Sequence, residues 1–127
     1  MAPPRFVLQE HWATAHHFDF RLEVDGVLRS WAVPKGPSTA VGERRLAVQV
    51  PDHDLAHADY EGPTVIIRDA GTFRSLDPDR SLAEQLDAGH AKFWLDGEHL
   101  KGGWTLHRTT DGAKPQWLLL KRKDDPA

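Results

Sequence analysis

The strongest constraint on the fold is a strict alternation of apolar and polar residues in the segment HHFDFRLEVDG, residues 16–26. Every second position is apolar: Phe18, Phe20, Leu22 and Val24. The positions between them are polar: the imidazole of His17, the carboxylate of Asp19, the guanidinium of Arg21 and the carboxylate of Glu23, in that order. Because successive side chains of a strand point to opposite faces, the segment predicts a β-strand with one apolar and one polar face.

Short strands recur along the rest of the chain. The sequence predicts them at RFVLQEH, VLRSWAV, RRLAVQV, TVIIRDAGTF, KFWLDG, GGWTLHR and QWLLLKR. One short α-helix is predicted near residues 81–88, where Ser81 and Glu84 form a capping box and Gly89 follows the last turn. Short strands at regular spacing are typical of a small antiparallel barrel or sandwich, so a mainly β fold is expected.

The composition is that of one ordinary domain. With 127 residues, 39% of them hydrophobic and 28% charged, the chain is expected to form a single domain over residues 1–127. The absence of cysteine excludes disulfides and thiolate metal sites. The N-terminus lacks the apolar core of a signal peptide, and no apolar run approaches membrane-spanning length, so a cytoplasmic protein without a membrane partner is expected.

Charge is distributed unevenly along the chain. The net charge of −3 argues against a generally basic surface for nucleic acid. Acidic residues concentrate in 51–99, whereas 1–50 and 100–127 have a small positive balance. A phosphate-bearing partner is therefore expected to meet the two ends of the chain, which the fold must bring together.

The polar face of the segment 16–26 has the residue types of a metal site. Histidine is the commonest metal ligand in proteins, and His11, His17 and His53 accompany Asp19 in the first half of the chain. Two histidines and an aspartate form a nitrogen and oxygen ligand set that suits Mn²⁺, Fe²⁺ or Zn²⁺ and leaves positions open for substrate. The alternative interpretation is a solvated face of a half-exposed sheet.

Cations near these residues favour a phosphate-bearing substrate. Arg21 shares its strand face with Asp19, and Lys35 lies in the loop after WAV. Arg45 shares a face with Gln49, and His53 shares it too if the strand continues through Pro51. Fixed cations beside a metal suit a group whose charge is spread over several oxygens. Each cation taken alone is interpreted as a solvent-exposed charge, and only the consistent faces of these residues favour a site.

The remaining histidines and Trp12 are not assigned to this polar face. His16 points away from His17 because the two residues are adjacent on one strand. Trp12 follows His11 in a predicted loop, where it can flank a ligand. His90, His99 and His107 have no matching partners and are interpreted as surface or structural residues.

These residues resemble a known family, the 3′-phosphoesterase domain of bacterial DNA ligase D, which also occurs as a stand-alone protein. The resemblance is strongest in FVLQEHWATAHHFDFRLEVDGVLRSWAVPKGPS and continues through RRLAVQVPDHDLAHADYEG, TVIIRDAGTF and WLLLK. It implies a stand-alone member with a small closed antiparallel β-barrel of about eight strands and one short helix.

The resemblance also implies an activity. Such enzymes depend on Mn²⁺, which Zn²⁺, Co²⁺ or another divalent ion can replace, and they remove a 3′-terminal ribonucleoside and then the 3′-phosphate during DNA end joining. The implied substrates are DNA or DNA/RNA primer-template 3′ ends in the nucleoid. The implied partners are a ligase, a polymerase and Ku, with a monomeric domain.

Site residues follow from the same resemblance. By the motif, the metal ligands are His11, Asp19 and His53. His17 and Arg21 are implied to contact the scissile phosphate. Gln9, Lys35 and Arg45 also match functional positions.

The chain departs from the family's pattern near the site. Gly62 runs straight into PTVII, where the family has a glycine-rich segment such as IPEGEYGAG, so a loop is shortened. Pro51 and His57 stand where the family has an acidic residue and a tyrosine, and ten residues precede His11 where members often carry a charged arm. These departures bear on the phosphomonoesterase step more than on the fold.

Two other functions fit parts of the pattern. A cupin-type non-haem Fe(II) oxygenase uses two histidines and a carboxylate, which His17, Asp19 and a distant histidine imitate. A non-catalytic barrel that binds DNA ends or the ligation machinery would keep the fold without turnover. An anaerobic assay on 3′-phosphate DNA separates the oxygenase, and metal binding without turnover identifies the binding module.

Overall fold

The computed structural model describes residues 2–123, so Met1 and residues 124–127 of the predicted domain lie outside the described residues. The strands are β1 (Arg5–Trp12), β2 (His16–Val24), β3 (Val27–Val33), β4 (Arg45–His53), β5 (Val65–Ser75), β6 (His90–Asp96), β7 (Lys101–Thr110) and β8 (Gln116–Lys121). The helices are the 3-10 helix η1 (Leu55–Asp59) and the α-helix α1 (Leu82–Asp87).

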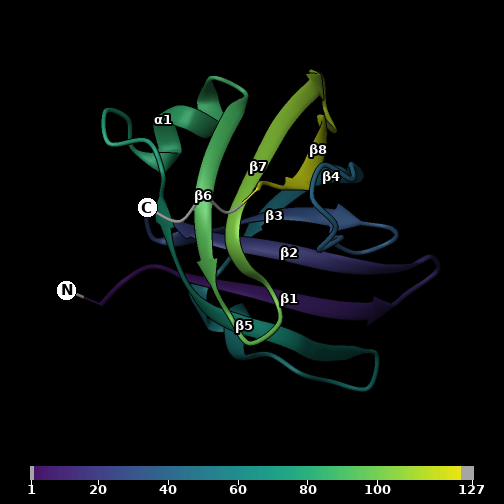
Figure 1. Cartoon of the computed structure of the whole chain (residues 1–127). Helices are drawn as coiled ribbons and strands as arrows, with labels where there is room; N and C mark the ends of the chain where they lie inside the picture. The colour runs from purple at the N-terminus through teal and green to yellow at the C-terminus, as the bar shows by residue number, and fades with distance from the viewer. Residues whose placement is uncertain (1, 124–127) are drawn as a thin grey trace.

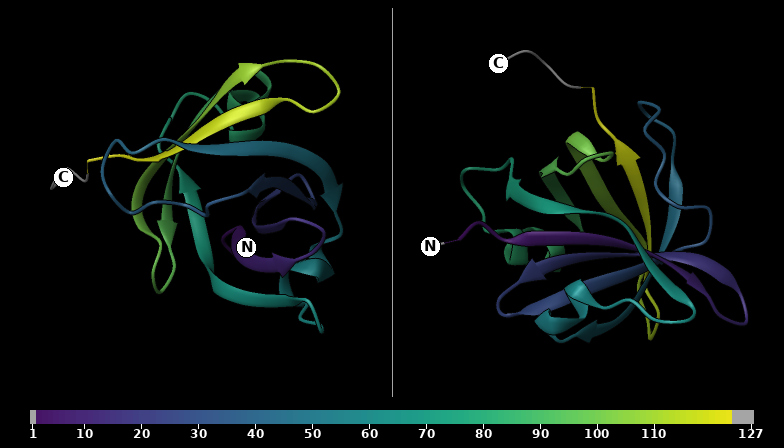
Figure 2. Two further views of the ribbon diagram at one scale, coloured as in Figure 1. Left: turned by 90° about the vertical axis from the view of Figure 1, so that its right-hand side faces the viewer. Right: turned by 90° about the horizontal axis from the view of Figure 1, so that it is seen from below.

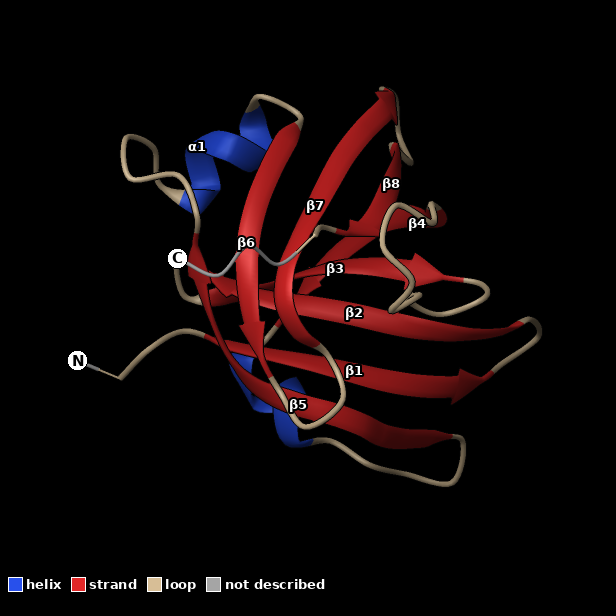
Figure 3. Cartoon of the chain, viewed as in Figure 1, coloured by secondary structure: helices blue, strands red, loops and turns tan. Residues whose placement is uncertain are grey.

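The strands close into one antiparallel barrel, in the order β1-β2-β3-β4-β8-β7-β6-β5. In Figure 1, β6 and β7 cross β1, β2 and β3 at a steep angle, and Figure 2 shows the same barrel from two further sides. The prediction of a mainly β barrel with one short α-helix is confirmed. Of the two architectures left open by strand spacing, the barrel is the one observed (Figure 3).

The helix α1 has the termini that the sequence predicts. Ser81 accepts a hydrogen bond from the backbone N–H of Glu84, and the Glu84 side chain accepts one from the backbone N–H of Ser81. Leu82 and Leu86 are buried in the main core, so α1 packs onto the barrel beside β6. No helix among residues 2–123 is long and apolar enough to cross a membrane.

The barrel interior holds the main apolar core, to which every strand contributes. Its large or fully buried members include Phe6, Phe20, Trp31, Ala47, Phe73, Phe93, Trp104 and Trp117. Burial of such side chains contributes roughly 25 cal/mol per Å² of apolar surface and is the main source of stability.

The polar face of β2 points away from this interior. Phe20 and Leu22 belong to the interior core, so Asp19 and Arg21, at alternate positions, lie on the outer side of the sheet. A second apolar cluster of Val7, Leu28 and Ala58 lies on that outer side and packs η1 onto the barrel. The outer polar face is therefore flanked by η1, a short helix that the sequence analysis did not predict.

The strand β4 continues through Pro51 to His53, as the predicted extension requires. However, Ala47 is buried in the interior core, and Gln49 accepts a hydrogen bond from the indole of Trp117. Arg45 shares the parity of these two residues. The expectation that His53 shares a face with Arg45 and Gln49 is therefore wrong.

A register shift between β3 and β4 explains why His53 does not share the face of Arg45 and Gln49. Along the β3–β4 ladder, Ser30 pairs with Val50, but Leu28 pairs with His53, so one extra residue is accommodated on β4. A bulge of this kind changes which face the following residues point to. Val50 and His53 consequently line the same outer hollow.

Candidate active site

The outer face of β1 and β2 carries a hollow of about 410 Å³, within the usual range of roughly 300–1,000 Å³ for small-molecule sites. Its lining residues come from β1, β2, β4, β5, η1 and the turn before β5. They are His11, His17, Asp19, Arg21, Val50, His53, His57, Tyr60, Thr64 and Val65.

Three of these side chains form a compact ligand group. His11 pairs with His17 across the β1–β2 ladder, and Asp19 follows His17 by two positions on the same face. Asp19 Oδ2 lies 3.5 Å from His11 Nδ1, and Asp19 Oδ1 lies 3.1 Å from His17 Nε2. The three ligand atoms all lie within 4.8 Å of one another. Two imidazoles and a carboxylate at this spacing fit one divalent ion such as Mn²⁺ or Zn²⁺.

The three side chains that lie together are not the three metal ligands that the family resemblance implies. His11 and Asp19 belong to the group of three, and its third member is His17, which was predicted as a phosphate contact. His53 lines the same hollow from β4 but lies outside that group. The ligand set His11, Asp19 and His53 thus stays a prediction, whereas the structure brings His11, His17 and Asp19 together.

Arg21 is a buried cation at the base of the hollow, with 4% of its surface exposed. Its Nη2 lies 3.3 Å from Asp19 Oδ2, its Nε donates to Gln9 Oε1 and its Nη1 donates to Ser30 Oγ. Burial lowers the pKa of Arg21, and the Asp19 carboxylate partly offsets this, so the guanidinium stays charged at neutral pH. Arg21 therefore supplies a fixed positive charge directly beside the ligand group.

Gln9, one of the predicted functional residues, connects the two sides of the site. It is fully buried, and its Oε1 accepts the hydrogen bond from Arg21. Its Nε2 donates to the backbone carbonyls of His57 and Tyr60, at 2.9 and 3.0 Å. Gln9 therefore fixes both the guanidinium and the chain segment that follows η1, a positioning role that the structure makes visible.

A column of three stacked rings forms another wall of the hollow. The rings of His53 and His57 lie 4.4 Å apart at an interplanar angle of 23°, and those of His57 and Tyr60 lie 5.1 Å apart at 13°. Desolvation, followed by the charge of Arg21, lowers the pKa of both His53 and His57. The sequence analysis noted His57 only as a departure and missed Tyr60, because η1 has no clear sequence signal.

These shifted histidines predict a pH dependence of stability in the metal-free protein. Because the pKa of both rings is lower in the folded chain, the unfolded chain binds more protons below its ordinary histidine pKa of about 6.5. The stabilisation is present above that pH and is lost as the pH falls through the folded-state values. Urea unfolding at pH 7, 6 and 5 is expected to show a falling free energy of unfolding.

Two variants check the origin of this loss. His57→Phe keeps a stacked ring but removes one titrating group, so its stability should fall less steeply with decreasing pH. His99→Gln changes an exposed histidine and should leave the slope as it is in the unsubstituted chain. Equal slopes for His57→Phe and the unsubstituted chain would contradict the explanation.

Lys35 and Arg45 lie elsewhere. They line a different hollow, together with Pro34, Glu43, Arg44 and Leu46. Arg45 donates to Glu43 Oε1 through Nε and Nη2, at 3.0 and 2.6 Å, and to the Lys35 carbonyl through Nη1. The structure therefore does not bring these two cations into the hollow of the ligand group, and their functional role stays a prediction.

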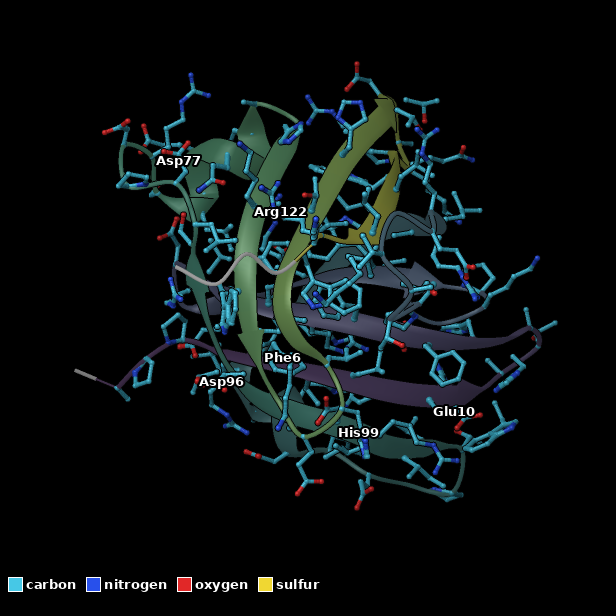
Figure 4. All side chains as sticks on the ribbon, in the orientation of Figure 1. Phe6, Glu10, Asp77, Asp96, His99 and Arg122 are labelled. Atoms are coloured by element: carbon cyan, nitrogen blue, oxygen red, sulfur yellow. The ribbon has the colours of Figure 1, made fainter. Side chains whose placement is uncertain are left out.

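The face opposite the site carries His16, as strand parity predicts. His16 Nε2 lies 2.6 Å from Glu10 Oε2, and Arg68 pairs with the other oxygen of the same carboxylate. The His16 ring also stacks on Trp12, with centroids 5.6 Å apart. Burial raises the pKa of Glu10, but the hydrogen bonds from His16 and Arg68 outweigh it and hold the pKa below its ordinary value. This cluster ties β1 to β2 and β5 behind the site; Glu10 is labelled in Figure 4.

Comparison with known proteins matches the chain to one family. The model of the DNA ligase D 3′-phosphoesterase domain family matches residues 9–108, a range that includes every predicted site residue. The chain is 48% identical over 133 aligned positions to the multifunctional non-homologous end joining protein LigD of Pseudomonas aeruginosa, covering 97% of this chain and 16% of that protein.

More distant relatives carry similar names. The chain is 36% identical to the multifunctional non-homologous end joining DNA repair protein LigD of Mycobacterium tuberculosis, over 94% of this chain and 16% of that protein. It is 34% identical to the LigD protein of Mycolicibacterium smegmatis, over 94% of this chain and 17% of that protein. The chain thus spans about one sixth of the length of the curated relatives it matches.

Proposed function

The chain belongs to the DNA ligase D 3′-phosphoesterase domain family, and from this membership we propose that it is a metal-dependent phosphoesterase that processes 3′ ends of DNA. It removes a 3′-terminal ribonucleoside or a 3′-phosphate during end joining. The observation that carries the proposal is the grouping of His11, His17 and Asp19 beside the buried Arg21 in one open hollow.

His11, His17 and Asp19 are the residues that would hold the divalent ion, with Mn²⁺ as the proposed cofactor and Zn²⁺ or Co²⁺ as substitutes. When bound, the ion supplies Lewis acidity, which polarises a phosphoryl oxygen and activates water. The donor set supports this assignment because it combines imidazole nitrogens with a carboxylate within 4.8 Å, and all three residues line the hollow.

The protein's own side chains handle the charge of the substrate. The contacts of Arg21 with Asp19, Gln9 and Ser30 use three of its five N–H groups, so donors remain for a non-bridging phosphate oxygen. His53 faces the same hollow from β4, and its lowered pKa keeps it neutral, so one ring nitrogen carries a proton for a hydrogen bond to phosphate. Such preorganised donors stabilise charge that develops in the transition state.

DNA or DNA/RNA 3′ ends are the proposed substrates, and a ligase, a polymerase and Ku are the proposed partners, because the relatives are named as end-joining proteins. With a net charge of −3, the chain is expected to bind duplex weakly and with strong salt dependence through local cations. Assay of a primer with a 3′-phosphate or one 3′-ribonucleotide, with and without Mn²⁺, tests the activity. Equal turnover without any divalent ion would contradict the metal requirement.

Adjacent histidines on opposite faces provide a matched pair of variants. His17→Ala is expected to lower the rate of 3′-phosphate removal by at least about 10²-fold, the scale for losing one positioned group at the reacting centre. His16→Ala is expected to cost less than about tenfold, which corresponds to roughly 1.4 kcal/mol. Gel mobility of the labelled primer measures both rates.

Mn²⁺ titration of the same variants separates loss of the ion from loss of fold. His17→Ala should lose Mn²⁺ affinity, whereas His16→Ala should retain it, since the His16 ring contacts Glu10 and Trp12 on the opposite face. If His16→Ala were the inactive variant and His17→Ala the active one, the assignment of the site to the outer face would be wrong.

A further inference from the structure

The hollow has two chemically different sides. One side carries the charged and metal-binding groups of β1 and β2, namely His11, His17, Asp19 and Arg21. The other side carries Tyr60, Thr64 and Val65, which offer an aromatic ring, a methyl group and an isopropyl group. The proposed phosphate contacts, Arg21 and His53, do not include Tyr60, Thr64 or Val65, so these three residues are available to the organic part of a ligand.

The aromatic part of this second side ends in an open ring. Tyr60 is the last ring of the stacked column, and one of its faces is covered by His57 at 5.1 Å. The residue nevertheless keeps 45% of its surface exposed. Because Tyr60 is also a lining residue of the hollow, its ring is accessible to a planar group there.

The position of Tyr60 is fixed before any ligand arrives. Gln9 Nε2 donates to the Tyr60 carbonyl at 3.0 Å, which holds its backbone. The phenol end lies against Gly62, where a Cβ would be 2.5 Å from the Tyr60 hydroxyl oxygen. The stack on His57 sets the plane of the ring. A preorganised ring loses little entropy when it binds a partner.

We infer that Tyr60 is the stacking platform for the nucleobase of the nucleotide that carries the scissile phosphate. This inference rests on the proposed function, because it takes the phosphate to lie beside Arg21 and the ligand group. Stacking on an aromatic side chain tolerates any base, since every base has a π-face.

The first test uses the unsubstituted protein. Fluorescence anisotropy measures binding of a labelled oligonucleotide with a 3′-phosphate, in EDTA and at fixed salt, against the same oligonucleotide whose last nucleotide lacks its base. Removing the base is expected to weaken binding about tenfold, the effect of roughly 1.4 kcal/mol. Equal affinity for the two oligonucleotides overturns the inference.

The second test uses variants. Tyr60→Ala should weaken binding of the base-bearing end by about the same factor and should cause no further loss on the abasic end. Tyr60→Phe keeps the ring and should restore base-dependent binding. Equal weakening of both ends by Tyr60→Ala would show a merely structural role and overturns the inference.

A third oligonucleotide, ending in a 3′-hydroxyl, separates this inference from the function it rests on. If the protein prefers the 3′-phosphate over the 3′-hydroxyl but ignores the base, the stacking platform is wrong and the phosphoesterase proposal stands. If it distinguishes neither the phosphate nor the base and shows no Mn²⁺-dependent hydrolysis, both are overturned.

Discussion

Asp19→Asn is expected to lower kcat/KM for 3′-phosphate removal by about 10³-fold, because one carboxylate serves the whole site. Asp19 lies within 3.5 Å of a nitrogen of His11, His17 and Arg21. The amide keeps the size of the side chain but removes the negative charge that a divalent ion requires. Mn²⁺ binding, measured by calorimetry, should be lost together with activity on a 3′-phosphate primer.

The barrel itself is expected to persist in this variant, since Arg21 keeps its hydrogen bonds to Gln9 and Ser30. Asp25→Asn is the matched control, because it makes the same chemical change at an exposed turn position whose φ of 51° asparagine tolerates. Asp25→Asn should leave both activity and Mn²⁺ affinity unchanged. Retention of Mn²⁺ binding in folded Asp19→Asn would remove this carboxylate from the ligand set.

His53→Ala extends the same test to the two ligand sets. It is expected to lower activity but to retain Mn²⁺ binding, because His53 lies outside the group formed by His11, His17 and Asp19. Loss of Mn²⁺ binding in His53→Ala, with binding retained in His17→Ala, would instead favour the set His11, Asp19 and His53 that the family resemblance implies.

The second large effect is expected on stability, at Asp69. The residue is 5% exposed, and its carboxylate accepts hydrogen bonds from the backbone N–H groups of Ala70, Glu98, His99 and Leu100, at 2.7 to 3.1 Å. Three of these donors form the turn between β6 and β7, where His99 is labelled in Figure 4. Asp69→Ala should lower the free energy of unfolding by about 3 kcal/mol, because hydrogen bonds to charged groups contribute roughly 1.5–3 kcal/mol each and water replaces part of them.

Thermal unfolding measures this effect, and a decrease of about 10 °C is expected for a domain of this size. The exposed Asp79→Ala is the control and should change stability by less than about 0.5 kcal/mol. A Cβ at Gly97 would lie 2.6 Å from Asp69 Oδ2, so the turn is packed directly against the carboxylate. If Asp69→Ala unfolded at the temperature of Asp79→Ala, the turn would not depend on this anchor.

The sequence by itself determined the strands of the barrel and the polar face that carries the candidate site. Alternation in β2 separates Phe20 and Leu22 from Asp19 and Arg21 because strand geometry has a period of two residues, a local property of the chain. The same rule placed His16 and His17 on opposite faces, and the capping box of Ser81 and Glu84 located α1. Closure of the strands into a barrel rested on the family resemblance, since strand spacing alone also allowed a sandwich.

Only the tertiary structure decided which candidates meet, because contacts between distant segments depend on register and packing. The bulge opposite Leu28 turns His53 toward the site and leaves Arg45 on the other face, where it pairs with Glu43. Gln9 holds the segment after η1 through backbone carbonyls that no sequence pattern marks. That segment carries Tyr60, and its place beside the ligand group follows from the packing of η1 on the outer wall of the barrel.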